Sequence, residues 1–362
     1  MEDNKIRVGI TQGDINGIGY EVILRTFDEP MMLELCTPVV YGSAKVAAYH
    51  RKALGMTTPF TAIKNADDAE DNRLNILNCT DDEVKVDLGK ADPEAGRAAL
   101  AALERAVEDY REGLIDVLVT APINKHTIHS DEFDFPGHTE YLEQRLGNGH
   151  TSLMVLMKDD LRVALVTNHL PVSQIAASIT QERIVEKLTI FSRSLRFDFG
   201  IEAPRIAVLA LNPHAGDEGL LGTEEQEIIR PAMREAEQRG VLCFGPYPAD
   251  GFMGSGNYCH FDGILAMYHD QGLAPFKALA MDEGVNFTAG LPVVRTSPAH
   301  GTAYDIAGQG VASESSFRQA VYTAIDVYRN RRRVREASRN PLRKQYYDRH
   351  DDSDKLKLDS AE

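Results

Sequence analysis

The chain has 362 residues, with 55 acidic and 39 basic side chains and a formal net charge of −16. Hydrophobic residues make up 43% and charged residues 26%, which is a globular composition and excludes a disordered, collagen-like or disulfide-framed chain. The length predicts about two domains. The acidic balance disfavours a nucleic-acid-binding protein, whose footprint is a basic face.

The four cysteines are far apart in the sequence and form no C-x-x-C pair. In a chain of this length we expect free thiols in a reducing compartment. The first residues lead into an apolar run without a preceding basic segment, and no apolar run is long enough to span a bilayer. We therefore expect a soluble cytoplasmic protein with no membrane partner.

Short apolar runs rich in β-branched residues alternate with longer segments of helical period, which is typical of α/β layers around a largely parallel sheet. In chain order the predicted strands are 6–11, 38–41, 74–77, 115–120, 153–157, 163–167, 205–211 and 264–268. Leu100, Leu103 and Val107 recur at helical spacing and predict a helix over 93–113. A last helix is predicted over about 316–329. The charged residues beyond it predict a solvated helix end and a loose tail.

Three of the predicted strands are followed directly by a segment that carries a histidine. His169 follows strand 163–167, His214 follows strand 205–211, and His269 follows strand 264–268. In an open α/β sheet, ligands bind beyond the carboxyl ends of the strands. Three imidazoles at that edge predict a site for Zn²⁺ or a similar divalent ion, although each histidine alone fits a hydrogen-bonded structural role.

Two glycine-containing turns have the composition of ligand loops. Residues 11–19 lie between a predicted strand and a predicted helix, where glycines can expose N–H groups to an anion. A plain strand–helix turn fits this segment equally well. Gly137-His138-Thr139-Glu140 opens a predicted helix, either as an anion cradle or as a simple N-cap.

A third such segment covers residues 300–308. Gly301 and Gly308 bracket a predicted short helix, where a nucleotide can approach the backbone closely. Upstream of it, Lys277, Asn286 and Arg295 bring two cations and an amide into one stretch of sequence. The guanidinium of Arg295 suits a carboxylate or phosphate, and Lys277 suits a point charge or a proton shuttle.

Together these segments resemble the 4-hydroxythreonine-4-phosphate dehydrogenase family, whose members act in vitamin B6 (pyridoxal phosphate) synthesis. The resemblance covers about residues 6–330 and is carried mainly by 137–140, 211–216 and 266–273. It implies an α/β fold like that of isocitrate and isopropylmalate dehydrogenases, with two α/β/α domains and a cleft between them. By the same resemblance, residues 1–127 and 286–330 form an outer, cofactor-side domain. Residues 128–285 form a central, metal-binding and dimerisation domain, and 331–362 form a charged tail.

The resemblance also assigns functional residues, position by position. The implied divalent-metal ligands are His169, His214 and His269, with zinc, magnesium or cobalt as the ion and ligands from both subunits of a homodimer. The implied substrate contacts are His138, Thr139, Lys277, Asn286 and Arg295. Lys277 or Asp250 is the implied proton-transfer group. NAD or NADP is expected to lie against the turn that holds His300, Gly301 and Asp305.

The implied reaction is oxidation at C3 of 4-phosphooxy-L-threonine to 2-amino-3-oxo-4-phosphooxybutanoate, which loses CO₂ to give 3-amino-2-oxopropyl phosphate. The sequence departs from the family pattern at 15–20, which replaces a Pro-Ala-Gly-Ile-Gly-Pro turn, and at Asn168 and Gly251, where threonine is usual. A paralogous reaction on phosphorylated threonate or erythronate therefore stays open. A non-redox phosphate acyltransferase of related fold and a scaffold protein that uses the charged tail are alternatives from other classes.

Overall fold

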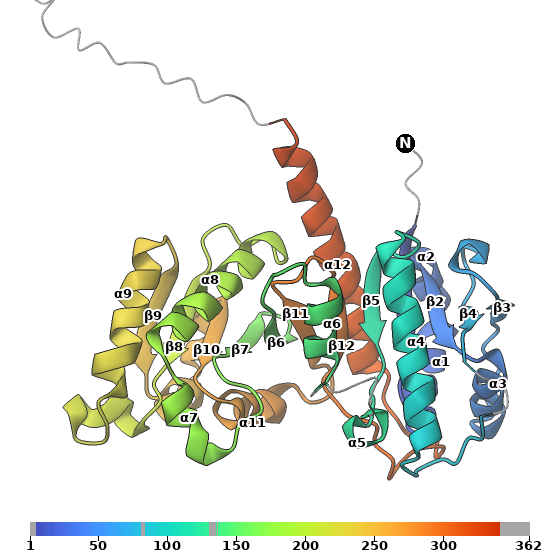
Figure 1. The fold of residues 1–362 in the computed structure, drawn as a ribbon, viewed down its shortest axis with the longest axis horizontal. Helices are drawn as coiled ribbons and strands as arrows, with labels where there is room; N and C mark the ends of the chain where they lie inside the picture. Colours follow the sequence, from blue (N-terminus) through green and yellow to red (C-terminus); the bar gives the residue numbers. More distant parts are fainter. Residues whose placement is uncertain (1–4, 81–83, 130–134, 136, 341–362) are drawn as a thin grey trace, which may run out of the picture.

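The computed structural model describes residues 5–80, 84–129, 135 and 137–340. Over these residues the strands form a 12-stranded sheet in the order β3-β4-β2-β1-β5-β12-β11-β6-β7-β10-β8-β9 (Figure 1). The strands are β1 (Ile6–Thr11), β2 (Cys36–Gly42), β3 (Thr61–Ile63), β4 (Asn75–Asn78), β5 (Val117–Thr120), β6 (Leu153–Lys158), β7 (Leu161–Leu165), β8 (Arg205–Leu209), β9 (Leu242–Tyr247), β10 (Gly263–Ala266), β11 (Val285–Ala289) and β12 (Arg295–Pro298).

The α-helices are α1 (Gly19–Asp28), α2 (Pro30–Leu35), α3 (Ala44–Ala53), α4 (Pro93–Arg111), α5 (Lys125–Ile128), α6 (His138–Leu146), α7 (Val172–Ser178), α8 (Gln181–Phe197), α9 (Arg230–Gln238), α10 (Ala249–Gly254), α11 (His269–Ala280) and α12 (Ser315–Ser338). Shorter helical turns are η1 (Ala66–Asp68), η2 (Pro213–Gly219), η3 (Glu225–Ile229) and η4 (Asn257–His260). In the described part of the chain, no helix is long and apolar enough to cross a bilayer.

Every strand predicted from the sequence is present, with small shifts at its ends. The prediction missed β3, β9, β11 and β12, which are short or lie among turn residues. Most pairings are parallel, as predicted, but β11 is antiparallel to both of its neighbours and β6 is antiparallel to β7. The order places β1–β5 and β12 in one half of the sheet, the first half, and β6–β11 in the other, the second half.

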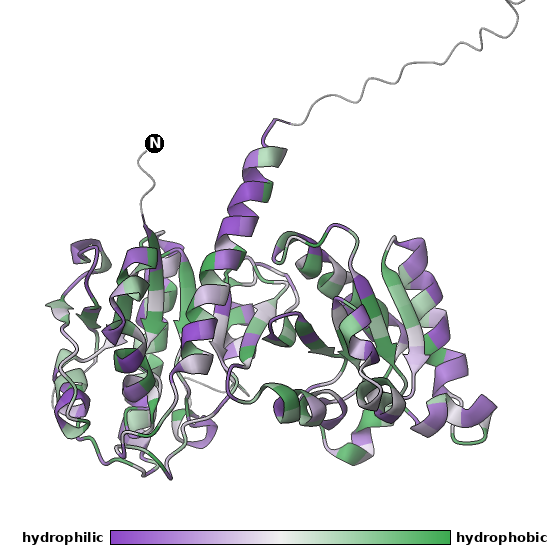
Figure 2. Ribbon diagram, turned by 180° about the vertical axis from the view of Figure 1, so that it is seen from behind, coloured by the Kyte–Doolittle hydropathy of each residue, from purple (hydrophilic) through white to green (hydrophobic). Residues whose placement is uncertain are grey.

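Helices cover both faces of the sheet, and apolar side chains fill the space beneath them. On one face, α1, α12, α8 and α9 share one continuous core that extends along both halves. On the other face the core is divided, with one cluster under α4 and α6 and another around α10 and α11. Figure 2 shows the same layering, because the strands are mainly hydrophobic and the outer helix faces hydrophilic. The molecule is therefore an α/β layered fold, as the sequence predicts.

Two predicted helices show how local sequence sets their ends. Asp92 accepts a hydrogen bond from the N–H of Glu94 at 2.7 Å and caps α4, whose buried face includes Leu100, Leu103 and Val107 as predicted. Helix α12 continues to Ser338, beyond the predicted end near 329, and its last turns extend away from the sheet (Figure 1). The predicted short helix between Gly301 and Gly308 is wrong, because that segment is a series of turns.

The buried His50 links the first glycine-containing turn to α3 and makes stability pH-dependent. Its Nε2 donates to the carbonyl of Ile15 at 2.8 Å, and burial lowers the pKa of His50 from 6.5 to about 4. A folded-state pKa below the unfolded value means that this stabilisation is complete above about pH 6.5 and is lost as the pH falls towards 4. At pH 5 the loss amounts to about 2 kcal/mol.

We expect His50→Gln to lower stability at pH 7.5 and to flatten its decline between pH 7.5 and 5. Urea unfolding at the two pH values measures the difference, with His126→Gln as a matched control because His126 is exposed. An unchanged decline in the His50 variant would assign the pH dependence to other groups.

Candidate functional site

A cavity of about 320 Å³ lies where the two halves of the sheet meet, beyond the carboxyl ends of β5, β7, β10 and β12. Its walls come from the segment after β5, the start of α6, the segment after β7, helix α11 and the segment after β12. The position agrees with the rule that open α/β sheets bind ligands beyond the carboxyl ends of their strands.

Nine residues singled out from the sequence line this cavity together. They are His138, Thr139, His169, His269, Lys277, Asn286, Arg295, His300 and Gly301. They come from different elements, so only the folded chain brings them together. Helix α11 supplies His269, Leu273 and Lys277, which are spaced four residues apart and therefore lie on one helix face. Three other predicted residues, His214, Asp250 and Asp305, are not part of the cavity wall.

Arg295 is the most deeply buried cation of the cavity, at 2% exposure. Its Nη2 donates to Thr120 Oγ1 at 2.6 Å and to His138 Nδ1 at 3.2 Å, and its Nη1 donates to Thr288 Oγ1 at 3.3 Å. Burial lowers the pKa of Arg295 to about 10, while nearby Glu140 opposes this shift. Among the described residues no carboxylate forms a hydrogen bond or ion pair with this guanidinium. A buried cation held only by neutral groups is suited to an anionic ligand.

Three buried polar atoms in the cavity wall have no hydrogen-bond partner in the described structure: His138 Nε2, Asn286 Oδ1 and His300 Nε2. Burial, with Arg295 and Lys125 nearby, holds the pKa of His138 well below its usual range, so the ring is neutral. Because its Nδ1 accepts from Arg295, its Nε2 carries the hydrogen and can donate to a ligand. Unpaired buried polar atoms are costly, and their gathering here indicates a site built for a polar molecule.

His169 and His269 form an imidazole pair at the cavity wall. Their ring centroids are 5.5 Å apart, and His269 Nδ1 donates to Asp270 Oδ1 at 2.7 Å. Burial, then Lys125 and His269, lower the pKa of His169, which favours the neutral ring. A neutral imidazole is the form that binds metal ions, and an Nδ1 bound to a carboxylate leaves Nε2 free as a ligand atom.

His214 lies apart from this pair, exposed on the turn η2. His214, Ala215, Asp217 and Glu218 have φ values of 52°, 55°, 45° and 55°. In this left-handed region the Cβ atom crowds the following carbonyl oxygen, which costs about 1–2 kcal/mol of conformational energy per non-glycine residue. Within the described part of the chain, no three His, Cys, Asp or Glu residues are arranged to hold a metal ion. One chain therefore brings together two of the three predicted metal ligands.

The buried Glu225 anchors the start of this turn. One carboxylate oxygen accepts from the N–H groups of Leu211 and Asn212, both at 2.8 Å, and the other accepts from Asn212 Nδ2 at 3.0 Å. Glu225 is 14 positions beyond Leu211 in the sequence, and no sequence pattern indicated it. It is a positioning residue that holds η2 in its strained conformation.

We expect Glu225→Gln to lower the free energy of unfolding by about 1–3 kcal/mol, because one amide N–H₂ then faces backbone donors. Urea unfolding measures this change. Glu227→Gln, an exposed neighbour in η3, serves as the matched control and should differ little from the parent chain. Equal stabilities for the two variants would show that η2 holds its shape without Glu225.

The cavity also contains residues that the sequence analysis missed. Lys125 begins α5 and its cation faces the start of α6, since a Cβ on Gly137 would lie 3.9 Å from Lys125 Nζ. Ser297 lines the wall as well. Thr120 lies behind the wall and holds Arg295. Lys125 comes soon after predicted strand 115–120, as the three histidines come soon after theirs. This shared placement could have predicted Lys125 as a residue of the site.

The predicted cofactor segment packs against the first glycine-containing turn. Ile18 N donates to the carbonyl of Thr302 at 3.1 Å, and a Cβ on Gly17 would meet that carbonyl at 2.7 Å. Tyr304 Oη donates to Asp14 Oδ2 at 2.6 Å and accepts from Asn124 at 3.0 Å. Of the two sequence interpretations of residues 11–19, the contacts at Gly17 favour the plain turn.

Comparison with known proteins relates this site to a family. The model of the family "Pyridoxal phosphate biosynthetic protein PdxA" matches residues 34–324. A 4-hydroxythreonine-4-phosphate dehydrogenase from Bacteroides thetaiotaomicron is 74% identical over all 362 residues, covering 100% of both chains. One from Sulfurihydrogenibium sp. is 39% identical over 90% of this chain and 100% of its own.

Two further relatives extend the comparison. A protein from Oceanobacillus iheyensis, provisionally named a D-threonate 4-phosphate dehydrogenase, is 37% identical over 88% of this chain and 97% of its own. The crystal structure of 4-hydroxythreonine-4-phosphate dehydrogenase from Klebsiella pneumoniae superposes with a TM-score of 0.76 at 33% identity, covering 90% of this chain and 100% of that one. On this evidence the chain belongs to the pyridoxal phosphate biosynthetic protein PdxA family.

Proposed function

We propose that the chain oxidises 4-phosphooxy-L-threonine with a nicotinamide cofactor, NAD or NADP, and that the product loses CO₂ to give 3-amino-2-oxopropyl phosphate. The observation that carries the proposal is the cavity around the buried Arg295. It combines an unpaired cation, free polar atoms and an imidazole pair, and relatives up to 74% identical are named for this reaction.

The anionic groups of the substrate are assigned to the side of the cavity near Arg295. Arg295 and His138 Nε2 would donate to phosphate or carboxylate oxygens, and Thr139 at the start of α6 would add a hydroxyl. Lys277 supplies a further positive charge. Asn286 Oδ1, buried without a partner, would accept from the hydroxyl or ammonium group of the substrate. These contacts orient C3 for reaction.

Oxidation of the C3 alcohol to a ketone removes the hydroxyl proton and a hydride, which carries two electrons. A bound nicotinamide cofactor would supply the acceptor for that hydride. Lys277 is our candidate for accepting the proton, because it lines the cavity. Asp250 is exposed on α10 and does not line the cavity. The geometry of one chain therefore does not support its predicted role in proton transfer.

The donor set fits a divalent metal ion. His169 and His269 of one subunit, with His214 of the partner subunit, would hold it in a homodimer whose two sites each take ligands from both chains. Imidazole nitrogens suit zinc or cobalt better than magnesium, which prefers oxygen ligands. A bound divalent ion supplies a positive charge that stabilises negative charge on the substrate oxygens during oxidation and decarboxylation. The strain in η2 supports a functional role for its histidine.

The nicotinamide end of the cofactor is assigned to His300 and Gly301. Both line the cavity, and a Cβ on Gly301 would meet no atom within 4 Å, so there is space beside its backbone. Asp305 is exposed outside the cavity, further along the same turns, where the remainder of a dinucleotide would extend. We retain the predicted division into two nested domains, with the cavity between them.

The test is a comparison of substrates with the purified full-length chain. Formation of reduced nicotinamide and release of CO₂ are expected with 4-phosphooxy-L-threonine, with a higher kcat/KM than with threonate 4-phosphate. A preference for threonate 4-phosphate would assign the chain to the paralogous reaction, which the Oceanobacillus relative makes a real alternative. No reduction of NAD or NADP with either substrate would favour a non-redox acyl transfer. Full activity after dialysis against a chelator would contradict the proposed requirement for a divalent metal ion.

A further inference from the structure

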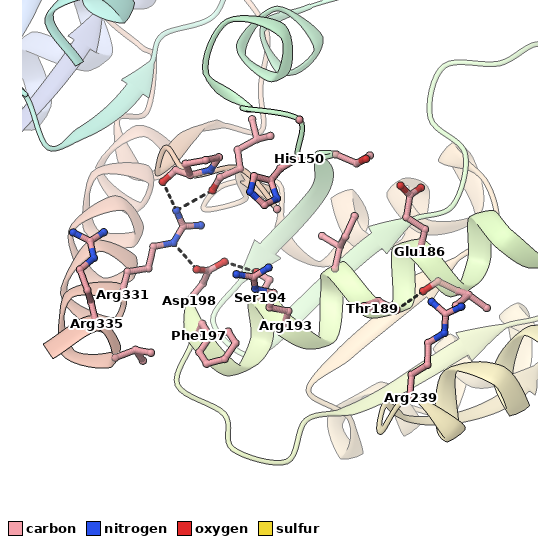
Figure 3. Close-up of a pocket in the computed structure, with 18 of the residues that line it drawn as sticks. His150, Glu186, Thr189, Arg193, Ser194, Phe197, Asp198, Arg239, Arg331 and Arg335 are labelled. Carbon is pink, nitrogen blue, oxygen red and sulfur yellow. Dashed lines mark hydrogen bonds and ion pairs between the residues drawn. The ribbon is translucent and has the colours of Figure 1, made fainter. Parts of the chain in front are cut away.

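A second, larger cavity lies apart from the candidate active site. It has a volume of about 950 Å³ and shares no lining residue with the cavity around Arg295. Its walls are α8, the end of α9, the last turns of α12 and the segments 149–151 and 290–292 (Figure 3). These two segments adjoin the start of β6 and the end of β11, which are paired in the sheet.

The lining combines apolar surface with arginines. Val185, Ile190, Phe197, Leu291 and Val334 supply the apolar part. Figure 3 shows Arg331 and Arg335 from α12 on one side of the pocket, Arg193 from α8 near the middle, and Glu186 and Arg239 on the other side. A concave surface of this volume that combines an apolar lining with a few charged groups is typical of small-molecule sites.

The three arginines differ in what they already bind. Arg331 is satisfied, because its Nε donates to Asp198 Oδ1 at 2.6 Å and its Nη1 donates to the carbonyls of Leu291 and Pro292 at 3.0 and 2.8 Å. Arg193 and Arg335 have no hydrogen bond or ion pair with any residue that the structure describes. Arg331 therefore shapes the wall, while the guanidinium groups of Arg193 and Arg335 are free to bind an anion.

The carboxylates of the pocket limit what the ligand can be. Glu182 and Glu186 lie on the first half of α8, and Arg193 lies about 10–16 Å further along the helix axis. Glu235 is already bound to Gln181 at 2.7 Å and to Arg239. An anionic group is favoured beside Arg193 and Arg335 and is disfavoured beside Glu182 and Glu186. The charge pattern admits one anionic group on an apolar body.

Part of this pocket lies outside the region that defines the family. Arg331, Val334, Arg335 and Ser338 belong to the last turns of α12, and the family model ends at residue 324. The pocket thus depends on the last turns of α12, which continue beyond the end near 329 that the sequence predicted. The inference is independent of the function proposed for the other cavity.

We propose that this pocket, at the groove between α8 and α12, is a second binding site for a small organic anion. The ligand carries one phosphate or carboxylate group, bound by Arg193 with Arg335 adding positive charge, and an apolar body against Phe197 and Val334.

The chain contains no tryptophan, which permits a fluorescence test specific to this pocket. Phe197 lines it at 38% exposure, so Phe197→Trp introduces a unique reporter. The full-length variant is titrated with 4-nitrophenyl phosphate, 4-nitrobenzoate and neutral 4-nitrobenzyl alcohol, whose nitroaromatic rings quench tryptophan. Saturable quenching is expected with at least one of the two anions. The anion that binds more tightly shows whether the pocket prefers a phosphate or a carboxylate group. The alcohol should bind about tenfold more weakly.

Adding Arg193→Ala and Arg335→Ala to the reporter chain should weaken binding of the anion about tenfold or more. Arg333→Ala is the matched control, because Arg333 is exposed on the same helix and does not line the pocket. It should leave the affinity within about twofold, and thermal melts confirm that each variant is folded. Quenching that does not saturate, or that is as strong with the alcohol or in the double variant, would overturn the proposal.

Discussion

Arg295→Met is expected to lower kcat/KM about a thousandfold while leaving the folded chain at least as stable as the parent. Truncating one partner of a buried charge pair costs about 2–5 kcal/mol or more, and under the proposed function the phosphorylated substrate is the partner that Arg295 lacks in the free protein. In the absence of ligand the same guanidinium is a buried cation without a carboxylate bound to it among the described residues. Replacing this group by an apolar side chain removes the cost of burying a charge, which offsets the loss of its hydrogen bonds to Thr120, Thr288 and His138.

This opposite movement of activity and stability distinguishes a ligand-binding residue from a structural one. Steady-state kinetics and urea unfolding of the same preparation provide both measurements. Arg295→Lys keeps a positive charge but loses the planar group that bridges Thr120, Thr288 and His138, so only part of the activity should return. If Arg295→Met unfolded as its activity disappeared, the residue would be a structural cation and the proposed phosphate site would be wrong.

His214→Ala and Arg295→Met are expected to be nearly inactive alone and to regain activity when mixed. In the proposed homodimer each site takes His214 from one subunit and Arg295 from the other. Random reassociation gives about half heterodimers, each with one intact site, so the mixture should recover about a quarter of the parent activity. The basis is the position of His214, outside the cavity that holds His169, His269 and Arg295.

His169→Ala mixed with Arg295→Met is the matched control. Both residues line the cavity of the same chain, so no heterodimer contains an intact site and no activity should return. Recovery is measured after the subunits are dissociated in mild denaturant and allowed to reassociate, with light scattering to confirm dimers. Failure of the His214→Ala mixture, with dimers present, would place all three histidines in one chain's site. Equal recovery in the control would also contradict the shared site.

The two cavities make the net charge a poor guide to ligands. A formal charge of −16 argues against nucleic acid as a partner, and this stays a prediction. The proposed phosphate site nevertheless contains Arg295, Lys277 and Lys125, because the local potential of a cleft depends on its own lining.

The sequence by itself determined most of the elements and predicted many of the residues that line the cavity around Arg295. Alternating apolar runs and helical segments encode which face each element buries, and this local property survives folding, so the predicted strands and the buried stripe of α4 are present. Histidines placed directly after strands were predicted to gather at one edge of the sheet. His169 and His269 do so, because parallel neighbours have their carboxyl ends together.

Only the tertiary structure decided the contacts that cross between elements. The insertion of β11 and β12 into the centre of the sheet brings Asn286 and Arg295 to the cavity, and no local pattern specifies strand order. Thr120 and Glu225 support candidate functional residues through hydrogen bonds that sequence spacing does not encode. The separation of His214 from the other two histidines has the same origin. Periodicity records which side of an element is buried, whereas strand order and long-range hydrogen bonds arise only when the whole chain packs.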